Sequence, residues 1–268
     1  MAQLSRLIGT FEELWPLAGA EEWDSPGLVC GNPVSEVGSV MLAVDVTRAV
    51  VDEAIAGEFD LLLAHHPFLM RGVKLLGEDS AKGATIGRSI RAGLAIYAAH
   101  TNADIVRDGV SDVLAKALGL QNLSPLVGED AGSGRVGNLT DSMTLGEFAS
   151  LVAQVLPRTA TGVRVAGDYN QVIERVAVCG GAGDSFIEAA VQAGADAYLT
   201  ADLRHHPVQE LRERTFTEAV PALLDVSHWA SEYLWLEVAA EQLRRIYPDL
   251  KVSVCDLRTD PWDFVVTQ

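Results

Sequence analysis

Histidines in this chain are clustered in a way that suits metal binding. Of the six histidines, four form the adjacent pairs His65-His66 and His205-His206, and a fifth, His228, precedes Glu232 by four residues. Imidazole nitrogens and carboxylate oxygens are good ligands for divalent transition metals. A single histidine is more often a core or surface residue, so it is the clustering that predicts a metal site.

The first pair stands at the end of an expected strand. Residues 61–64 form a short apolar run, and His65-His66-Pro67 follows it directly. Open α/β sheets place their functional sites at the carboxyl ends of their strands. Neighbouring residues of a strand face opposite sides, so both imidazoles can face one centre only where the chain turns, and Pro67 favours such a turn. Each imidazole can then bind a different ion.

Two further segments contribute carboxylates. His228 and Glu232 stand at the start of a helical pattern, and their spacing places both on one face of the helix. Asp104 follows another expected strand, and its negative charge helps to balance two dications. His100, four residues before Asp104, is either a weaker ligand or a partner that orients a ligand.

Each of these pieces also has a purely structural interpretation. The His65-His66 pair can cap a strand, and Asp104 can be a turn or N-cap residue. His228 and Glu232 can form a solvated pair on a helix surface. Spacing alone therefore favours the metal site without excluding these alternatives.

The surrounding pattern alternates between strands and helices. Residues 40–46 predict a strand, 47–56 a helix capped by its threonine, and 61–64 the next strand. A helix over 82–92 and a strand over 94–99 repeat this order. Such alternation predicts a largely parallel sheet covered by helices.

A glycine-rich stretch is the expected boundary between two lobes. The segment LVGEDAGSGRVG, residues 126–137, lacks any periodicity. We therefore expect a first α/β lobe over 1–127, a connection over 128–137 and a second α/β lobe over 138–268, whose C-terminal part supplies metal ligands. The expected fold is two interlocked α/β lobes with mixed, largely parallel sheets and the dinuclear metal site between them.

Local signals define the start of the second lobe. Thr144 and Glu147 form a capping-box pattern that opens a helix. A strand over 176–179 is followed by a turn that contains Gly180, Gly181 and Gly183. Such a turn can hold a phosphate on backbone N–H groups, although glycine-rich turns between a strand and a helix are usually just tight turns.

Composition excludes several classes of protein. The formal net charge is −17, with 37 acidic against 20 basic side chains, which disfavours nucleic acid as a partner. No apolar run approaches the roughly 20 residues that a membrane-spanning helix needs, and the N-terminus lacks the pattern of a signal peptide. The three cysteines lie far apart and form no Cys-x-x-Cys motif, so a cytoplasmic protein with reduced thiols is expected.

These segments, in this order, resemble the family of GTP cyclohydrolase 1 type 2 homologs, also described as dinuclear metal centre hexameric proteins. The resemblance spans nearly the whole chain and is carried by Glu22-Trp23-Asp24-Ser25-Pro26-Gly27-Leu28, Ala64-His65-His66-Pro67, His100-Thr101-Asn102-Ala103-Asp104, Gly180-Gly181-Ala182-Gly183, Thr200-Ala201-Asp202-Leu203-Arg204-His205-His206 and Asp225-Val226-Ser227-His228-Trp229-Ala230-Ser231-Glu232.

The resemblance implies a site and an assembly. It implies that His65, His66, Asp104 and His228 each bind one ion of a pair and that Glu232 touches both. It also implies a toroidal homohexamer with the sites facing an inner cavity. Longer members of the family carry an inserted middle domain, which the short glycine-rich stretch of this chain does not accommodate. The chain departs from the family at Ser25-Pro26 and Ser227, where the family often has Asn and Gly, and the first change puts substrate contacts near Trp23 in doubt.

The second histidine pair has two interpretations. The resemblance includes His205 and His206, though not as metal ligands, which makes them candidates for cavity lining or substrate contact. They can equally be the first residues of a helix that begins near Pro207.

The expected reaction follows from the metal pair. Two dications bridged by a carboxylate lower the pKa of a bound water and present hydroxide to an electrophile, so a metal-dependent hydrolase is expected. The donor set without thiolate fits two Zn, Mn, Fe or Co ions per chain. The family name implies GTP or a related nucleotide as the small-molecule substrate, with His100 as a candidate proton shuttle. The alternative is a non-catalytic metal-binding scaffold or metal chaperone.

Overall fold

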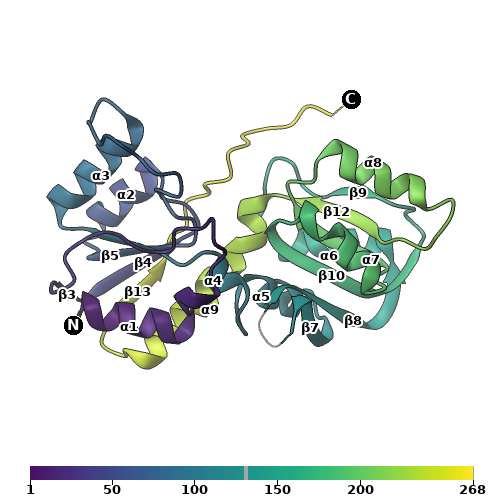
Figure 1. Ribbon diagram of the computed structural model, residues 1–268, viewed down its shortest axis with the longest axis horizontal. Helices are drawn as coiled ribbons and strands as arrows, with labels where there is room; N and C mark the ends of the chain where they lie inside the picture. The colour runs from purple at the N-terminus through teal and green to yellow at the C-terminus, as the bar shows by residue number, and fades with distance from the viewer. Residues whose placement is uncertain (130–131, 268) are drawn as a thin grey trace. The chain divides into compact units, whose positions relative to one another are not determined.

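Two α/β units make up the chain in the computed structural model, which describes residues 1–129 and 132–267 (Figure 1). Unit 1 comprises Met1–Ala103 and Leu236–Thr259, and unit 2 comprises Asp104–Trp235 and Asp260–Gln268. Both units combine parallel and antiparallel strands with helices, so the expected mixed α/β fold is confirmed.

Unit 1 is built on a five-stranded sheet with the order β13-β4-β5-β6-β2. Strands β4 (Ser39–Ala43), β5 (Leu61–Ala64), β6 (Ala95–Ala98) and β13 (Lys251–Val254) run parallel, while β2 (Gly27–Cys30) pairs antiparallel with β6. A separate two-stranded ribbon joins β1 (Ala2–Gln3) to β3 (Glu36–Val37). Because β5 and β6 are neighbours in parallel, the segments that follow them emerge at the same edge of the sheet.

Local signals fix most helices of unit 1. Helix α2 (Arg48–Ala56) begins where the Thr47 hydroxyl accepts the Val50 N–H, and α3 (Ala81–Ala92) ends at Gly93 with a φ of 73°. Helix α1 (Leu4–Leu14) and the 3-10 turn η1 (Leu17–Gly19) precede β2. The short α4 (Thr101–Asp104) and the long α9 (His228–Ile246) each cross from one unit to the other.

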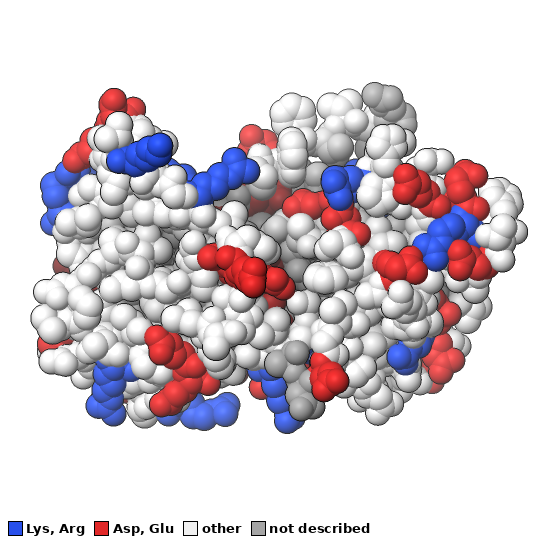
Figure 2. Space-filling model, in the orientation of Figure 1, with Lys and Arg blue, Asp and Glu red and all other residues white. Residues whose placement is uncertain are grey.

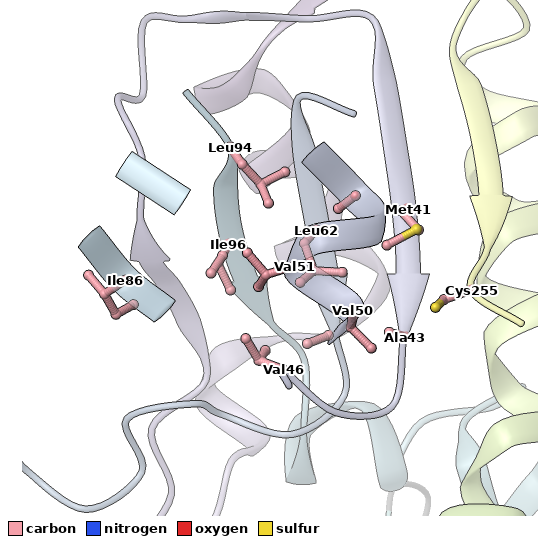
Figure 3. Packing of buried hydrophobic residues seen from close by; sticks show 12 residues of the cluster. Met41, Ala43, Val46, Val50, Val51, Leu62, Ile86, Leu94, Ile96 and Cys255 are labelled. Atoms are coloured by element: carbon pink, nitrogen blue, oxygen red, sulfur yellow. The ribbon is translucent and has the colours of Figure 1, made fainter. Parts of the chain in front are cut away.

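One core cluster of unit 1 packs α2 and α3 on its sheet (Figure 3). Met41, Leu62 and Ile96 come from three adjacent strands, and Val50 and Val51 of α2 pack on them. All five side chains are at most 2% exposed. Burial of side chains this large stabilises the fold by about 1.5–3 kcal/mol each, which holds the strand ends in place.

Unit 2 contains a six-stranded sheet with the order β7-β8-β10-β11-β12-β9. Strands β10 (Val172–Ala182), β11 (Ala197–Ala201) and β12 (Ala222–Val226) run parallel. The flanking strands β7 (Gln121–Gly128), β8 (Gly132–Thr144) and β9 (Arg164–Ala166) pair antiparallel. The parallel part of this sheet is therefore confined to its centre.

Helices α5 (Val110–Ala117), α6 (Leu145–Val155), α7 (Ile187–Gln192) and α8 (His205–Arg214) complete unit 2, with the 3-10 turn η2 (Asp184–Phe186) before α7. The predicted capping box opens α6, because the Thr144 hydroxyl accepts the Glu147 N–H and the Glu147 carboxylate accepts the Thr144 N–H. A buried cluster with Tyr198, Leu211 and Leu223 packs helices against this sheet.

The division into units differs from the one expected from the sequence. Instead of linking two lobes, the described residues of the glycine-rich stretch 128–137 lie in two paired strands, since β7 and β8 pair as far as Gly128 and Gly132. Residues 130 and 131 of this stretch lie outside the described residues. A side chain at Gly132 would meet the Val127 carbonyl oxygen at 2.0 Å, so close strand pairing explains this glycine. The chain instead changes units at 103/104, 235/236 and 259/260.

A second expectation is wrong at the predicted turn after residue 179. Strand β10 continues to Ala182, so Gly180 and Gly181 are strand residues rather than the opening of a turn. A Cβ at Gly180 would lie 2.5 Å from Val110 Cγ1. Close packing of α5 on β10 therefore accounts for this glycine.

The surface shown in Figure 2 is mostly uncharged, with acidic and basic side chains scattered among white residues. No broad basic patch is visible on that face. In the part of the chain that the structure describes, no helix has the length and hydropathy needed to cross a membrane.

Candidate metal centre

Unit 1 brings three histidines together at one edge of its sheet. His65 and His66 directly follow β5, and their backbone N–H groups donate to Ala43 O at 3.0 Å and Val44 O at 2.8 Å, so the chain stays paired beyond the strand. The two rings lie 5.1 Å apart, which puts both imidazoles on the same side of the chain. Pro67 follows, where the sequence predicted the turn.

His100 joins this pair from the neighbouring strand. It follows β6, and its ring lies 5.2 Å from that of His65 and 5.5 Å from that of His66. One ring nitrogen of each histidine lies within 4.8 Å of the others, a spacing that can hold a metal ion. Adjacent parallel strands thus deliver all three imidazoles to one point.

An oxygen acceptor holds the Nδ1 atom of each ring. His65 Nδ1–H donates to Ala99 O at 2.9 Å, and His66 Nδ1–H donates to Asp45 Oδ1 at 2.7 Å. His100 Nδ1–H donates to Asp24 Oδ1 at 2.8 Å. A proton fixed on Nδ1 leaves the lone pair on Nε2, which is the usual arrangement of histidines that bind metals.

Asp24 connects its loop to His100 and Thr101 through hydrogen bonds. Its second oxygen accepts the Thr101 hydroxyl at 2.6 Å and the Thr101 N–H at 3.1 Å. Burial raises the pKa of Asp24, but the hydrogen bonds from His100 and Thr101 outweigh it and lower the pKa to about 2. The carboxylate is therefore charged across the physiological pH range. Trp23, the residue before Asp24, places its ring 5.9 Å from that of His100.

Unit 2 contains the second group of predicted ligands. His228 is the first residue of α9, and its Nε2 atom lies 2.9 Å from Glu232 Oε1, one helical turn later. His228 Nδ1–H donates to Asp202 Oδ2 at 2.7 Å. Burial lowers the pKa of His228, but the carboxylates of Glu232 and Asp202 outweigh it and raise the pKa to about 11. His228 therefore carries a proton that a metal ion would replace.

Asp104 and Glu232 both lie near the buried thiol of Cys179. Burial, together with the negative charges of Asp104 and Glu232, raises the pKa of the Cys179 thiol to about 12. Two carboxylates near one buried thiol concentrate negative charge in the interior of unit 2, which is costly without a cation. Cys179 is a protonated thiol in the metal-free protein, and the groups of potential metal donors among the described residues consist of histidine and glutamate side chains.

A glycine makes room for the ligand pair. Gly181 has a φ of 69°, and a Cβ there would lie 2.5 Å from Glu232 Oε1 and 3.2 Å from His228 Nε2. Its N–H donates to Ser231 Oγ at 2.9 Å, and its carbonyl accepts the Thr200 hydroxyl at 3.0 Å. Gly181 therefore borders the candidate ligands, whereas Gly183 packs against Tyr198 and Thr200.

The second histidine pair lies elsewhere in unit 2. His205 and His206 begin α8, both are exposed, and their rings are 5.2 Å apart. His205 lines a cavity of about 360 Å³ beside Arg164 and Asp225. The groups of three or more potential metal donors among the described residues include neither histidine.

Sequence reasoning missed the residues that orient the histidines. Asp45 was not identified, and Asp24 and Asp202 were noted only as parts of motifs. A usable signal existed, because Asp45 lies two residues beyond β4 and Asp202 directly follows β11. Both stand at carboxyl ends of parallel strands, where the rule applied to His65 and Asp104 also holds.

Known proteins resemble this chain over nearly its whole length. The sequence profile of the Duf34/NIF3 (NGG1p interacting factor 3) family matches residues 2–261. A Streptomyces coelicolor protein named GTP cyclohydrolase 1 type 2 homolog is 44% identical over 272 residues, covering 98% of this chain and 94% of that protein. A Mycobacterium tuberculosis protein of the same name is 33% identical over 372 aligned positions, covering 97% of each chain.

Solved structures show the same fold. The Bacillus cereus protein related to NIF3 superimposes with a TM-score of 0.91 at 26% identity, covering 98% of this chain and 99% of that one. The Staphylococcus aureus hypothetical protein SA1388 superimposes with a TM-score of 0.89 at 28% identity and the same coverage. With a profile match over nearly its entire length and a relative 44% identical, the chain belongs to the Duf34/NIF3 (NGG1p interacting factor 3) family.

Proposed function

We propose that this protein is a hydrolase that depends on two divalent metal ions and acts on GTP or a related nucleotide. The observation that carries the proposal is shared by His65, His66, His100 and His228: an oxygen atom holds Nδ1 of each ring. Histidines that are merely buried in a core have no reason to share this hydrogen bond. A histidine that binds a metal needs a fixed ring and an Nε2 atom without a proton, and a hydrogen bond from Nδ1 provides both.

The proposed ligands are His65, His66, Asp104, His228 and Glu232. The unit 1 residues offer imidazole nitrogens, and the unit 2 residues offer two carboxylates and His228, so the set combines nitrogen donors with the negative charge that two dications need. Such a donor set fits Zn, Mn, Fe or Co. Two divalent ions at this set would activate water for hydrolysis at neutral pH.

His100 is proposed to move a proton. Its Nδ1–H bond to Asp24 leaves Nε2 facing the other two imidazoles of unit 1, and its side chain is 13% exposed. The anionic Asp24 stabilises the imidazole when Nε2 takes up a proton, so His100 can accept a proton and release it again.

The choice of substrate comes from the relatives. Several are named GTP cyclohydrolase 1 type 2 homolog, which supports a purine nucleotide as the molecule whose ring is opened by water. The same resemblance supports a homohexamer, and light scattering that found a monomer at micromolar concentration would contradict that assembly.

Metal analysis and a product assay test the proposal together. Purified protein is expected to hold close to two ions per chain, and His65→Ala and Glu232→Ala are expected to lose most of them. Metal-loaded protein incubated with GTP is expected to release formate or a ring-opened nucleotide, detected by mass spectrometry, and to stop on chelation. Full metal content in both variants would contradict the site. Full metal without any product would favour a non-catalytic metal scaffold or chaperone.

A further inference from the structure

The C-terminal tail, residues 261–267, exposes an unusual amount of apolar surface. Its large side chains are 63% exposed at Trp262, 79% at Phe264, 56% at Val265 and 76% at Val266. All seven residues are exposed, and none belongs to a helix or strand (Figure 1). Folded proteins rarely leave several large hydrophobic residues in sequence open to water, so this tail has the properties of an interaction segment.

The tail has the pattern of a β-strand. Trp262, Phe264 and Val266 alternate with Asp263 and Val265, so an extended conformation would place the first three on one face. Aromatic and β-branched residues also favour strands. The family profile ends at residue 261, so these side chains lie beyond the part of the chain that it matches.

Unit 2 offers a matching surface at the edge of its sheet. Strand β9 is the last strand in the order β7-β8-β10-β11-β12-β9, and Val165 within it is 42% exposed. The cavity of about 360 Å³ beside β9 is lined by the apolar residues Ala166, Leu203, Val208 and Leu223. A cavity of about 150 Å³ is enough to hold benzene, so this one can accommodate an aromatic side chain.

Charges on the rim complement the tail. Arg164 and Arg204 line the same cavity, and their side chains are 68% and 76% exposed. They form ion pairs with Asp225 and Asp184, and each guanidinium has five N–H donors, which leaves donors for another carboxylate. Asp263 stands between the two aromatic residues of the tail. In a chain with a net charge of −17, two arginines on one rim are a distinctive match for an acidic segment.

We propose that the tail of one copy of this chain docks on the β9 edge of a second copy. Trp262 or Phe264 fills the cavity, Asp263 meets Arg164 and Arg204, and the tail backbone extends the sheet as an added strand. Within one chain the tail and the cavity belong to the same unit, yet every tail residue remains exposed. A donor segment and an acceptor groove on one chain are the two parts of a head-to-tail contact between identical subunits.

Cross-linking between two differently labelled copies tests the docking. One full-length variant carries Val265→Cys and a size tag, and the other carries Val165→Cys without a tag. After mixing and addition of a short bismaleimide, a dimer of tagged and untagged chains is expected. As a matched control, Phe216→Cys replaces Val165→Cys, since Phe216 is 83% exposed and lies in the same unit. No mixed dimer, or a mixed dimer formed equally well with the Phe216→Cys control, would overturn the proposal.

Assembly measurements test the chemistry of the contact. The double variant Trp262→Ala/Phe264→Ala is expected to raise the concentration for half-assembly at least tenfold in sedimentation, with Phe216→Ala unchanged. Asp263→Arg and Arg204→Glu should each weaken assembly, and their combination should restore it. Metal content should stay at the wild-type level in all these variants, which separates this proposal from the metal site. Unchanged assembly in the aromatic double variant, or no restoration by the charge exchange, would count against the contact.

Discussion

His228 Nε2 lies 2.9 Å from Glu232 Oε1, and the two side chains share a proton that a metal ion must displace. The carboxylates of Glu232 and Asp202 overcome the effect of burial and raise the pKa of His228 to about 11. Below that pH the proton competes with the metal.

Metal binding is expected to release protons and to tighten as the pH rises. Because His228 is protonated in the metal-free protein throughout pH 6–9, each pH unit in that range should raise the affinity about tenfold for each displaced proton. Calorimetry in two buffers of different ionisation enthalpy measures the number released. An affinity independent of pH from 6 to 9 would show that His228 is not a ligand.

Gly181→Ala is expected to abolish metal binding. The new Cβ would lie 2.5 Å from Glu232 Oε1, and the φ of 69° adds a backbone cost of about 1–2 kcal/mol. Gly194 is a matched control, since its φ is 65° and nothing lies within 4 Å of its Cβ position. Gly194→Ala should show the backbone cost in denaturant unfolding and retain its metal. Equal metal content in the two variants would mean that Glu232 is not a ligand.

Asp202→Asn is expected to weaken metal binding by about 10–100-fold through its effect on His228. Asp202 has a φ of 56°, a conformation that asparagine tolerates, so the backbone should be preserved. Competition with a metal-sensitive dye measures the affinity. The exposed Asp249→Asn serves as the control for loss of one charge. Wild-type affinity in Asp202→Asn would show that this carboxylate does not orient the histidine.

His100→Ala is expected to retain most of the metal while losing most of the turnover. Asp24→Asn should keep most of the metal and lower the turnover, because the carboxylate that accepts the His100 Nδ1–H and fixes the ring is gone. Metal analysis and initial rates separate the two effects. If His100→Ala loses its metal, the residue is a ligand rather than a proton carrier.

Arg135→Met is expected to destabilise unit 2 by about 1.5–3 kcal/mol, because Asp112 loses its buried partner and keeps only Lys116. Arg135 is 4% exposed and donates to Asp112 Oδ1 at 2.9 Å and to Val106 O at 2.8 Å. Denaturant unfolding measures the loss, and Arg158→Met, at a mostly exposed arginine, is the control.

The ion pair between Arg135 and Asp112 makes the stability of unit 2 depend on pH. Burial raises the pKa of Asp112, but hydrogen bonds from Lys116, the Asp108 backbone and Arg135 outweigh it and lower the pKa. A carboxyl group whose pKa is lowered by folding stabilises the folded state at pH values above its pKa in the unfolded chain, near 3.9. This stabilisation is lost as the pH falls through the lower pKa of the folded state. Asp112→Asn should therefore be less stable at pH 7 and lose less stability between pH 5 and pH 3. An identical acid slope in both proteins would contradict this role.

Much of the fold follows from local patterns in the sequence. The helix that Thr47 caps, the capping box of Thr144 and Glu147, and the strand at 61–64 depend on residues within a few positions of one another. The clustering of His65 and His66, and the spacing of His228 and Glu232, are also local. Such features can be predicted because short-range hydrogen bonds and side-chain periodicity determine them.

Only the tertiary structure identified the partners of those residues. Asp45 lies 21 positions from His66, Asp202 lies 26 from His228, and Asp24 lies 76 from His100. The order of the strands decides which ends meet, and that order depends on packing across the whole sheet. For the same reason the glycine-rich stretch at 128–137 was expected to join two lobes and instead joins two strands. Composition and spacing specify which side chains can bind a metal, whereas strand pairing between distant segments decides which atoms orient them.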